Sequence, residues 1–514
     1  MSKTIIIIGA GLAGLSAALQ AAENGCNVKL VSSLPSERAQ SVMAEGGINA
    51  ALNTKDENDS PEEHFTDTIK AACGLADQNA VWGMTQAAPE LVHWLLKLGV
   101  KFNMSGYDDV DLRNFGGQKK KRTAFAQSDT GKQIMTAMID AVRRKEASGM
   151  VERFSHHSFL TLRLCGNICC GCVIRDEYSQ ETVELPGDAV IVATGGMHGL
   201  FGNTTGSLSN TGEVTAELFR LGVPLANGEM IQYHPTTVKC GGKRMLISEA
   251  ARGEGGRLFA MKDGKQWYFM EEKYPELGNL MPRDITAREI WKVSHESEVF
   301  LDMTEISEEI ISNKLSGLVD DCMTYLHKDI RKEPVSVLPG IHYFMGGILV
   351  DEQHRTPIQN LCAAGECCAQ YHGANRLGGN SLLGALYGGR VAAKSACEQA
   401  DVVDLSCATQ IDFPPASQIS EIKQLNKVMQ ETMGVVRNEN TLLNGIQTVQ
   451  ALTGNLPLLG MAVLKSALAR KESRGAHWRE DYPKSNDDDY LKTTVARFDG
   501  KQIQISFVPV PERR

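Results

Sequence analysis

The stretch TIIIIGAGLAGLSAALQAAENGCNVKLVSS, residues 4–33, decides the fold. A run of isoleucines comes first, and Gly9, Gly11 and Gly14 follow it with the spacing G-x-G-x-x-G. An alanine-rich helical stretch and a second apolar run complete a pattern of strand, tight turn, helix and strand. This βαβ setting favours a turn that binds a dinucleotide over a purely structural turn. Such glycines let the backbone approach a pyrophosphate at a helix N-terminus.

The second strand lacks one part of the dinucleotide pattern. An acid usually follows this strand and binds the adenosine ribose, but Ser32 and Ser33 occupy the position. A serine hydroxyl is therefore the candidate for that role. No second G-x-G-x-x-G occurs in the chain, so we expect one dinucleotide, with electrons supplied by another protein or a small molecule.

Two later segments have the form of further strands of the same sheet. They are DAVIVATGG, residues 188–196, and NLCAAGECC, residues 360–368. A sheet assembled from such distant segments implies an inserted domain. We therefore predict an α/β fold in which residues 1–225 and 339–404 form a Rossmann-like dinucleotide-binding domain. Residues 226–338 form the insertion, and residues 405–514 form a C-terminal helical region with a strand-like end.

The composition is that of an ordinary soluble globular protein. Hydrophobic residues make up 42% and charged residues 22%, and the formal net charge is −9. This charge gives no support to nucleic-acid binding. No uninterrupted apolar run is long enough for a transmembrane helix, and the N-terminal run has no cleavage pattern. We expect a cytoplasmic protein, with docking on a membrane partner left open.

The cysteine-rich segment CGNICCGC, residues 165–172, needs its own interpretation, because 13 cysteines occur in the chain. Its spacing fits neither paired zinc arms nor an iron–sulfur run. Strand-like stretches flank a Gly-Asn turn within it. We expect reduced thiols on a β-hairpin, and no metal site.

Residues 37–52, ERAQSVMAEGGINAAL, consist almost entirely of small side chains with two adjacent glycines. Such a stretch offers little for a protein core. We therefore expect a ligand to pack against its backbone.

A second group of residues suits a small dianion. The motifs are QYHPTT, ISEAARGEGG, MPRDITARE, GIHYFMGG and HGANRLGG, and they supply His234, Ser248, Glu249, Arg252, Arg283, His342 and Arg376. Arginine forks grip carboxylates in pairs, and neutral histidines or hydroxyls complete the hydrogen bonding.

Each residue of this group also has a structural explanation. His234 precedes a proline and can cap a turn, and Arg283 can form an ion pair at a helix start. Arg252 can pair with Glu254, and for these two residues we favour this structural explanation. The combination of five such motifs with a dinucleotide fingerprint in one chain favours a dianion site.

The motifs together resemble one known family. GAGLAG, AEGG, RNFGGQKKKRTAFAQSDTG, DAVIVATGG, QYHPT, EAARGEGG, PRD, HYFMGG, GEC, HGANRLGGNSL and SRGAHWREDYP occur in one order across essentially the whole chain. They closely resemble the flavoprotein subunits of succinate dehydrogenases and fumarate reductases, and L-aspartate oxidase somewhat less. The resemblance implies FAD in the Rossmann-like domain, an α+β capping domain over the flavin, and a helical C-terminal region.

The resemblance also assigns roles to residues. It implies that His234, Ser248, His342 and Arg376 bind the dicarboxylate, Ser248 replacing a usual threonine. Arg283 would donate the proton in fumarate reduction, with Glu249 and Arg252 as its relay. The expected FAD contacts are Gly9, Ala10, Gly11, Ala13, Gly14, Ser32, Ser33, Ser41, Ala44, Glu45, Gly46, Gly47, Ala193, Thr194, Gly195, Glu213, Glu366, Arg376, Ser381 and Leu382.

Two positions bear on the branch of the family. L-aspartate oxidases tend to carry Glu where Phe115 stands, and an apolar ring there, with Gly47 nearby, suits the bare central carbons of fumarate or succinate. The membrane-linked branch carries a histidine bonded to the flavin 8α-methyl, seven residues before the last glycine of AEGG. That position is Gln40, so we expect noncovalent FAD, a more reducing flavin, and a preference for fumarate reduction.

The leading hypothesis is thus a flavoprotein subunit that interconverts fumarate and succinate with electrons from an iron–sulfur partner. It would lie in the cytoplasm or on the cytoplasmic face of the membrane through its partners. L-aspartate oxidase, a reductase of another unsaturated acid, and a noncatalytic FAD-binding assembly subunit are the alternatives.

Overall fold

A parallel five-stranded sheet lies at the centre of the computed structural model, which describes residues 2–106, 109–399, 413 and 418–513. The strand order is β20-β10-β1-β2-β6. The strands are β1 (Thr4–Ile8), β2 (Asn27–Ser32), β6 (Val151–Ser155), β10 (Ala189–Val192) and β20 (Leu361–Ala363). The two later segments do supply β10 and β20, so that prediction is confirmed.

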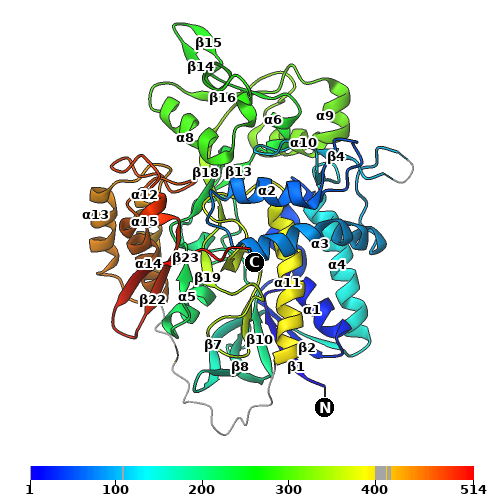
Figure 1. The fold of residues 1–514 in the computed structure, drawn as a ribbon, viewed down its shortest axis with the longest axis vertical. Coiled ribbons are helices and arrows are strands. Elements are labelled where there is room, and N and C mark those ends of the chain that lie inside the picture. The colour runs from blue at the N-terminus through cyan, green and yellow to red at the C-terminus, as the bar shows by residue number, and fades with distance from the viewer. Residues whose placement is uncertain (1, 107–108, 400–412, 414–417, 514) are drawn as a thin grey trace.

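The two faces of this sheet are covered differently. Ile5 and Ile7 pack against helices, whereas Ile6 and Ile8 pack against a second sheet, β7-β8-β9. Burial on both faces explains the unbroken apolar run. The helices are α1 (Leu12–Glu23), α3 (Gln78–Lys97), α4 (Thr130–Ala147) and α11 (Asn380–Gln399), which lie together on the right in Figure 1.

The second sheet carries the cysteine-rich segment. It consists of β7 (His157–Cys165), β8 (Ile168–Asp176) and β9 (Thr182–Pro186). The predicted hairpin is therefore present from His157 onward, while residues 151–155 join the main sheet instead. Cys169 and Cys172 point into the layer between the sheets, and burial raises the pKa of both thiols.

Cys165 differs from these two residues. It lies half-buried at the end of β7 and is disulfide-bonded. The expectation of reduced thiols throughout the segment is thus wrong for Cys165. Within the described residues, no group of three or more His, Cys, Asp or Glu side chains is arranged to hold a metal ion.

A second α+β unit lies above the central sheet, at the top of Figure 1. Its two sheets have the orders β13-β12-β18 and β15-β14-β16-β17. The strands are β12 (Ile231–Cys240), β13 (Lys243–Leu246), β14 (Arg257–Lys262), β15 (Lys265–Trp267), β16 (Val299–Asp302), β17 (Val335–Ser336) and β18 (Leu338–Phe344). The helices are α6 (Glu249–Gly253), α7 (Phe269–Lys273), α8 (Arg283–Val293), α9 (Glu308–Lys314) and α10 (Ser316–Asp321), followed by a π-helical turn (Cys322–Leu326). Phe115 from the first unit joins its apolar core.

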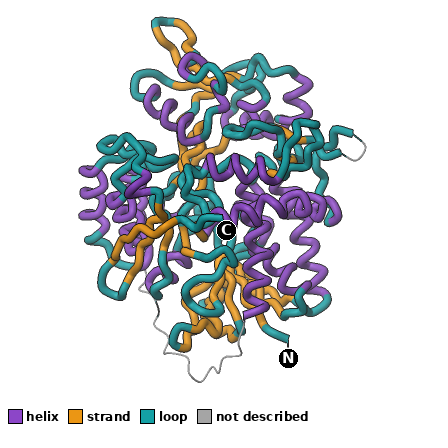
Figure 2. Tube along the Cα trace, viewed as in Figure 1, coloured by secondary structure: helices purple, strands orange, loops and turns teal. Residues whose placement is uncertain are grey.

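The third unit is mainly helical and appears on the left in Figures 1 and 2. It contains α12 (Ile419–Thr432), α13 (Glu439–Val449) and α14 (Asn455–Ala469), which pack with α5 (Glu213–Arg220). The predicted terminal strand is present as β23 (Ile503–Pro509), paired with β22 (Lys492–Phe498). These strands extend a sheet with β21 (Cys368–Ala369), β19 (Gly347–Leu349) and β11 (Leu225–Ala226).

The remaining short elements connect these units. They are α2 (Pro61–Ala71), α15 (Asp487–Tyr490), the strands β3 (Ile48–Asn49), β4 (Leu112–Arg113) and β5 (Thr123–Ala124), and the turns η1 (Ser36–Arg38), η2 (Gln40–Met43), η3 (His198–Leu200), η4 (Gly278–Leu280) and η6 (Gly365–Cys367). None of the helices in the described part of the chain has the length and apolar character that a bilayer span requires.

The expected domain limits do not all coincide with element ends. The limit at 225/226 falls within β11 and that at 338/339 within β18, and the limit at 404/405 lies outside the described residues. A limit inside a hydrogen-bonded strand would divide one sheet, so these two limits belong at strand ends. The division into domains stays a prediction.

Candidate active site

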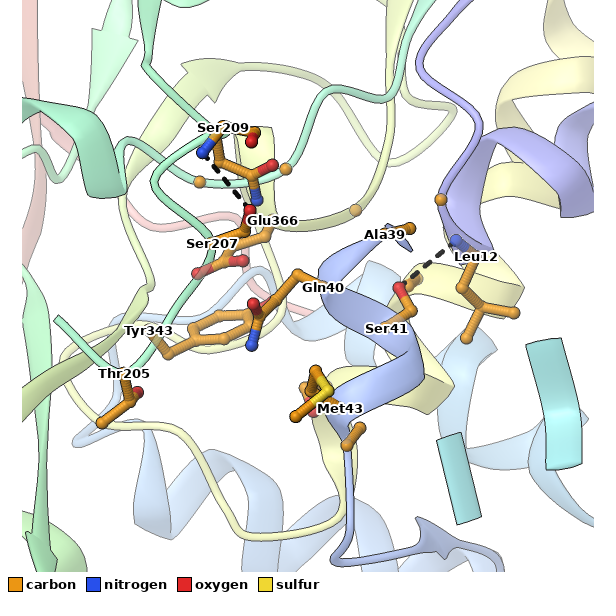
Figure 3. A pocket seen from close by; sticks show the side chains of 18 of the residues that line it. Leu12, Ala39, Gln40, Ser41, Met43, Thr205, Ser207, Ser209, Tyr343 and Glu366 are labelled. Carbon is orange, nitrogen blue, oxygen red and sulfur yellow. Dashed lines mark hydrogen bonds between the residues drawn. The ribbon is translucent and has the colours of Figure 1, made fainter. Parts of the chain in front are cut away.

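A cavity of about 630 Å³ extends from the glycine turn after β1 to the histidines of β12 and β18. Both motif groups line it. Gly9 and Gly11 of the glycine turn line one end. His234, Arg283 and His342, from the motifs predicted to bind a dianion, line the other. The loop that holds η1 and η2 borders it along one side, as Figure 3 shows. Residues predicted to bind a dinucleotide and residues predicted to bind a dianion therefore line the same cavity.

The glycine turn leaves the first turn of α1 open to this cavity. Gly11 is the N-cap and offers no side chain to the helix N–H groups. Leu12 N–H donates to Ser41 Oγ at 3.3 Å, which fixes the 37–47 loop against the helix start (Figure 3). Gly9 has a φ of +109°, and a Cβ there would lie 2.3 Å from Ala193 O. The backbone thus presents donors to an anion, as a pyrophosphate requires.

Gly14 packs closely against the glycine turn itself. It does not line the cavity, and a Cβ at this position would lie 1.8 Å from Gly9 O. Gly14 is needed for the close approach of α1 to the strand, and its expected contact with the cofactor stays a prediction.

Further groups at this end of the cavity suit a dinucleotide. Ser32 Oγ, at the end of β2, is buried and has no protein partner. Ser33 is exposed at the cavity edge, and Ser381 and Leu382 line it from the first turn of α11. Two helix N-termini and an unpartnered hydroxyl therefore surround the space that a pyrophosphate and ribose would fill.

The other expected cofactor residues are mostly on the cavity wall. They are Ala10, Ala13, Ala193, Thr194, Gly195, Glu213 and Glu366. Glu213 is exposed at the start of α5. Glu366 Oε1 accepts from Phe344 N–H at 3.0 Å and lies 3.5 Å from His198 Nε2.

The small residues of the 37–52 stretch contact protein as well as the cavity. Ser41, Ala44, Gly46 and Gly47 line it. A Cβ at Gly46 would lie 3.1 Å from the Phe115 ring, and one at Gly47 would lie 2.5 Å from Ala124 O. Close packing against protein is therefore a second reason for these glycines, beside the expected ligand.

Arg113 holds this loop in place. Its Nε donates to Gly46 O at 3.0 Å and its Nη2 to Glu45 O at 3.0 Å. Burial lowers the pKa of Arg113 to about 10, against the opposing effects of nearby acids. Burial, with the Asp321 carboxylate second, raises the pKa of Glu45 to about 8. Glu45 is therefore largely protonated at neutral pH.

Three charged side chains form a buried chain beside the cavity. Arg283 donates to Glu249 Oε2 from Nε at 2.8 Å, and Arg252 Nη2 lies 3.4 Å from Glu249 Oε1. Gly116 N–H donates to the same Oε1 at 3.1 Å. Burial would raise the pKa of Glu249, but Arg283 and Arg252 hold it below its usual value.

The favoured pairing of Arg252 with Glu254 is not found. Arg252 pairs with Glu249, one helical turn away on α6, and Glu254 pairs with Lys314 at 3.0 Å. The reason is geometric, because residues three apart on a helix share a face and residues two apart do not. Arg252 does not itself line the cavity and reaches it through Glu249.

The expected dicarboxylate residues converge on the cavity. The rings of His234 and His342 lie 5.2 Å apart, and Arg376 stacks over the Tyr343 ring at 4.3 Å. His234 Nε2 and Arg376 Nε are buried without a protein partner. Burial, followed by the nearby arginines, lowers the pKa of both histidines well below 6.5. Burial lowers the pKa of Arg376 to about 9. The site thus offers neutral imidazoles beside arginines.

Ser248 and Phe115 complete this end. Ser248 lines the cavity and caps α6, where its Oγ accepts from Ala250 N–H at 3.4 Å. Phe115 is only 2% exposed and presents its ring to the cavity.

The structure adds residues that the sequence interpretation did not identify. Gln232 accepts from Arg283 Nη1 at 3.1 Å and donates to Arg376 O at 2.9 Å, so it ties the two arginines together. Its position two residues before His234 on one strand was an available signal, because alternate residues share a face. Thr205 and Tyr343 also line the cavity, and Figure 3 shows the Tyr343 ring between Gln40 and Thr205.

Comparisons with known proteins agree with this geometry. A family model described as FAD binding domain matches residues 4–382, and one described as fumarate reductase flavoprotein C-term matches residues 452–513. The chain is 38% identical to the succinate dehydrogenase flavoprotein subunit of Bacillus subtilis (strain 168), over 100% of this chain and 98% of that protein. The chain belongs to the family of succinate dehydrogenase and fumarate reductase flavoprotein subunits.

This chain is also similar to fumarate reductase proteins. The 8-methylmenaquinol:fumarate reductase flavoprotein subunit of Wolinella succinogenes is 32% identical, over 100% of this chain and 92% of that protein. A chain in a structure of E. coli quinol fumarate reductase matches with a TM-score of 0.91 and 27% identity, covering 100% of this chain and 97% of that chain. As a flavoprotein subunit of this family, the protein is an FAD-dependent oxidoreductase.

Proposed function

We propose that this flavoprotein subunit interconverts fumarate and succinate, with fumarate reduction favoured. One observation carries the proposal: a single cavity is lined both by the glycine turn of the FAD-binding domain and by His234, Arg283, His342 and Arg376. Dinucleotide and dianion can therefore meet there. Relatives named as succinate dehydrogenase and as fumarate reductase subunits support the substrate pair.

The substrate carboxylates are bound by groups that have no protein partner or only a weak one. Arg376 supplies a positive charge, and its buried Nε is unpartnered, as is His234 Nε2. His342 and the Ser248 hydroxyl add donors. The apolar ring of Phe115 and the bare backbone of Gly47 leave the middle of the site without a charged partner. This suits a substrate with two carboxylates and an uncharged centre.

Arg283 donates the proton that one alkene carbon of fumarate needs. Its guanidinium is held by Glu249 and Gln232 at distances of 2.8 and 3.1 Å, so its orientation is fixed where Arg283 lines the cavity. Glu249 and Arg252 return a proton to Arg283 along the buried chain. Burial of the three side chains keeps water from competing with this transfer.

FAD, when bound, supplies the hydride at its N5, a chemistry that no side chain provides. The residues that would hold FAD are the glycine turn, Ser32, Ser41, Ser381 and Leu382, all on the cavity wall. The binding is noncovalent, because Gln40 has no imidazole nitrogen to attack the 8α-methyl. An unalkylated flavin is the better reductant, and this supports the preference for fumarate reduction.

The electrons come from an iron–sulfur partner subunit. The chain has one dinucleotide fingerprint and no ligand set for an iron–sulfur relay in its sequence. Membrane association would then be indirect, through partners, with this subunit in the cytoplasm or on the cytoplasmic face.

The deciding experiment compares substrates on the purified FAD-loaded protein. We expect turnover of fumarate with a low-potential artificial electron donor, and little oxygen-dependent turnover of L-aspartate. The reverse result would identify an L-aspartate oxidase, and retained flavin without turnover of any dicarboxylate would identify a noncatalytic assembly subunit. Faster reduction of a different unsaturated acid than of fumarate would identify the protein as a reductase of that acid.

A further inference from the structure

His342 has a polar partner on the side of its ring away from Nε2. Its Nδ1 lies 2.8 Å from Thr205 Oγ1. Thr205 comes from the segment after η3, and an isolated bridge between Thr204 and Ile341 brings that segment beside β18. The two residues are 137 positions apart in the chain, so their contact is created by the tertiary fold. Both line the cavity (Figure 3 labels Thr205).

The Thr205 hydroxyl has two groups within reach to which it can donate, the first only when Nδ1 carries no proton. One is His342 Nδ1 at 2.8 Å, and the other is Ile341 O at 3.3 Å. Ile341 O already accepts from the Thr205 backbone N–H at 2.9 Å. The carbonyl can accept a second bond, but 3.3 Å is long for an O–H···O bond, so donation of the single hydroxyl proton to Nδ1 gives the stronger bond.

A neutral imidazole carries one N–H, and the partner of one nitrogen decides which nitrogen bears it. Burial, together with Arg283 and Arg376, lowers the pKa of His342 well below 6.5, so the ring is neutral at physiological pH. If Nδ1 accepts from Thr205, the proton lies on Nε2. In the other tautomer Nε2 presents a lone pair, which repels a carboxylate oxygen.

His234 lacks an equivalent partner. Its Nδ1 lies 3.1 Å from Thr236 O, 3.3 Å from Thr236 N and 3.4 Å from Thr236 Oγ1. These contacts include both a donor and an acceptor at similar distances, so they do not select one tautomer. Of the two histidines, only His342 has a partner that specifies which ring nitrogen carries the proton.

We propose that Thr205 is a positioning residue that holds His342 in the tautomer protonated at Nε2, so that His342 donates a hydrogen bond to a substrate carboxylate. This inference rests on the proposed dicarboxylate site. It adds Thr205 as the residue that makes His342 Nε2 a hydrogen-bond donor in that site.

The test uses Thr205→Val and Thr205→Ser in the FAD-loaded protein. Valine keeps the shape and the backbone N–H to Ile341 O and removes only the hydroxyl, whereas serine keeps the hydroxyl. We expect Thr205→Val to raise the Kd of malonate, a non-reacting dicarboxylate, and the KM of fumarate about five- to tenfold. Its kcat and FAD content should change less than about twofold, and Thr205→Ser should restore malonate binding.

A matched control is Thr432→Val. Thr432 is 6% exposed and its hydroxyl donates to Val428 O at 2.6 Å in α12, so this variant also removes a buried hydroxyl bond but contacts no histidine. It should leave malonate binding unchanged. An unchanged malonate Kd in Thr205→Val, or a serine variant as weak as the valine variant, would overturn the proposal.

A second readout separates this inference from the proposed function. Nitrogen NMR of protein labelled with ¹⁵N-histidine reports which ring nitrogen is protonated, and His342→Gln assigns the signal. We expect a neutral His342 protonated at Nε2 in the wild type, and a shift toward the other tautomer in Thr205→Val. If the wild type binds no dicarboxylate but its His342 is protonated at Nε2 and Thr205→Val shows the shift, the proposed function fails and the tautomer assignment stands. A wild-type ring protonated at Nδ1 would refute the assignment directly.

Discussion

Arg283 donates to the same oxygen of Glu249, Oε2, from Nε at 2.8 Å and from Nη2 at 2.6 Å. Both side chains are buried, and Arg252 approaches the other oxygen at 3.4 Å. One carboxylate therefore faces two buried guanidinium groups, so one positive charge is left in excess beside the cavity. A dianionic substrate would complete the charge balance, which links the local electrostatics to the proposed reaction.

Replacement of the proposed proton donor should reduce turnover without emptying the site. Arg283→Lys loses the forked contact with Glu249, because an ammonium group cannot make both bonds in this geometry. We expect kcat for fumarate reduction to fall at least about 100-fold, while FAD content and malonate binding stay near wild type.

Arg288→Lys is the matched control for this change. Arg288 lies on the same helix, stacks over Trp478 at 4.0 Å and does not line the cavity, so its variant should keep wild-type turnover. An Arg283→Lys protein as active as the control would remove Arg283 from the mechanism.

The nature of the FAD linkage is open to a simple chemical test. With Gln40 at the position of the linking histidine, precipitation of the FAD-loaded protein in acid should release all of the flavin into the supernatant. Absorbance of the supernatant and the pellet measures the partition. A yellow pellet that keeps its flavin after washing would contradict noncovalent binding.

The pKa of Glu45 predicts a pH-dependent effect on stability. Burial and the Asp321 carboxylate raise it to about 8 from 4.5. Between these values the unfolded chain binds fewer protons than the folded chain, so the free energy of unfolding falls as the pH rises. Glu45→Gln cannot titrate and should gain stability relative to wild type from pH 5 to pH 8. We expect a relative gain on the order of 2 kcal/mol, below the full linkage value because the cavity admits solvent.

Thermal or urea unfolding at several pH values measures this difference. Glu90→Gln, on the exposed face of α3, should show a difference from wild type that stays constant with pH. A Glu45→Gln difference that is equally constant would show that Glu45 does not titrate in this range.

The buried ion pair between Arg470 and Glu229 should contribute mainly to stability. Arg470 Nε donates to Glu229 Oε1 at 2.7 Å, and neither side chain is exposed. Glu229→Ala leaves a buried arginine with less compensation and should cost about 3 kcal/mol in the free energy of unfolding. Glu229→Gln, which keeps an acceptor, should cost less.

The control for this prediction is Glu431→Ala. Glu431 lies 4.0 Å from Lys427 on the surface of α12, with both side chains mostly exposed, and its removal should change stability by less than about 0.5 kcal/mol. Urea unfolding measures all three variants, and a loss in Glu229→Ala no larger than in the control would contradict the prediction.

Much of the site could be predicted because its signals are local. The glycine spacing after β1, the apolar strands and the motifs around His234, Arg283, His342 and Arg376 are each contained within a few residues. The pairing of Arg252 could not be chosen from the sequence, since both Glu249 and Glu254 are near it in the chain. Gly14 could not be separated from Gly9 and Gly11, because spacing alone does not tell a packing contact from a ligand contact.

The order of residues along the chain is enough to specify the βαβ unit, the composition of the two binding motifs and the absence of an imidazole at Gln40. Short-range sterics and hydrogen bonding are sufficient for these features. The tertiary structure alone decided that Thr205 contacts His342, that Gly46 packs against Phe115, and that Gln232 joins Arg283 to Arg376. These partners are far apart in the chain, so only the packing of the folded units selects them.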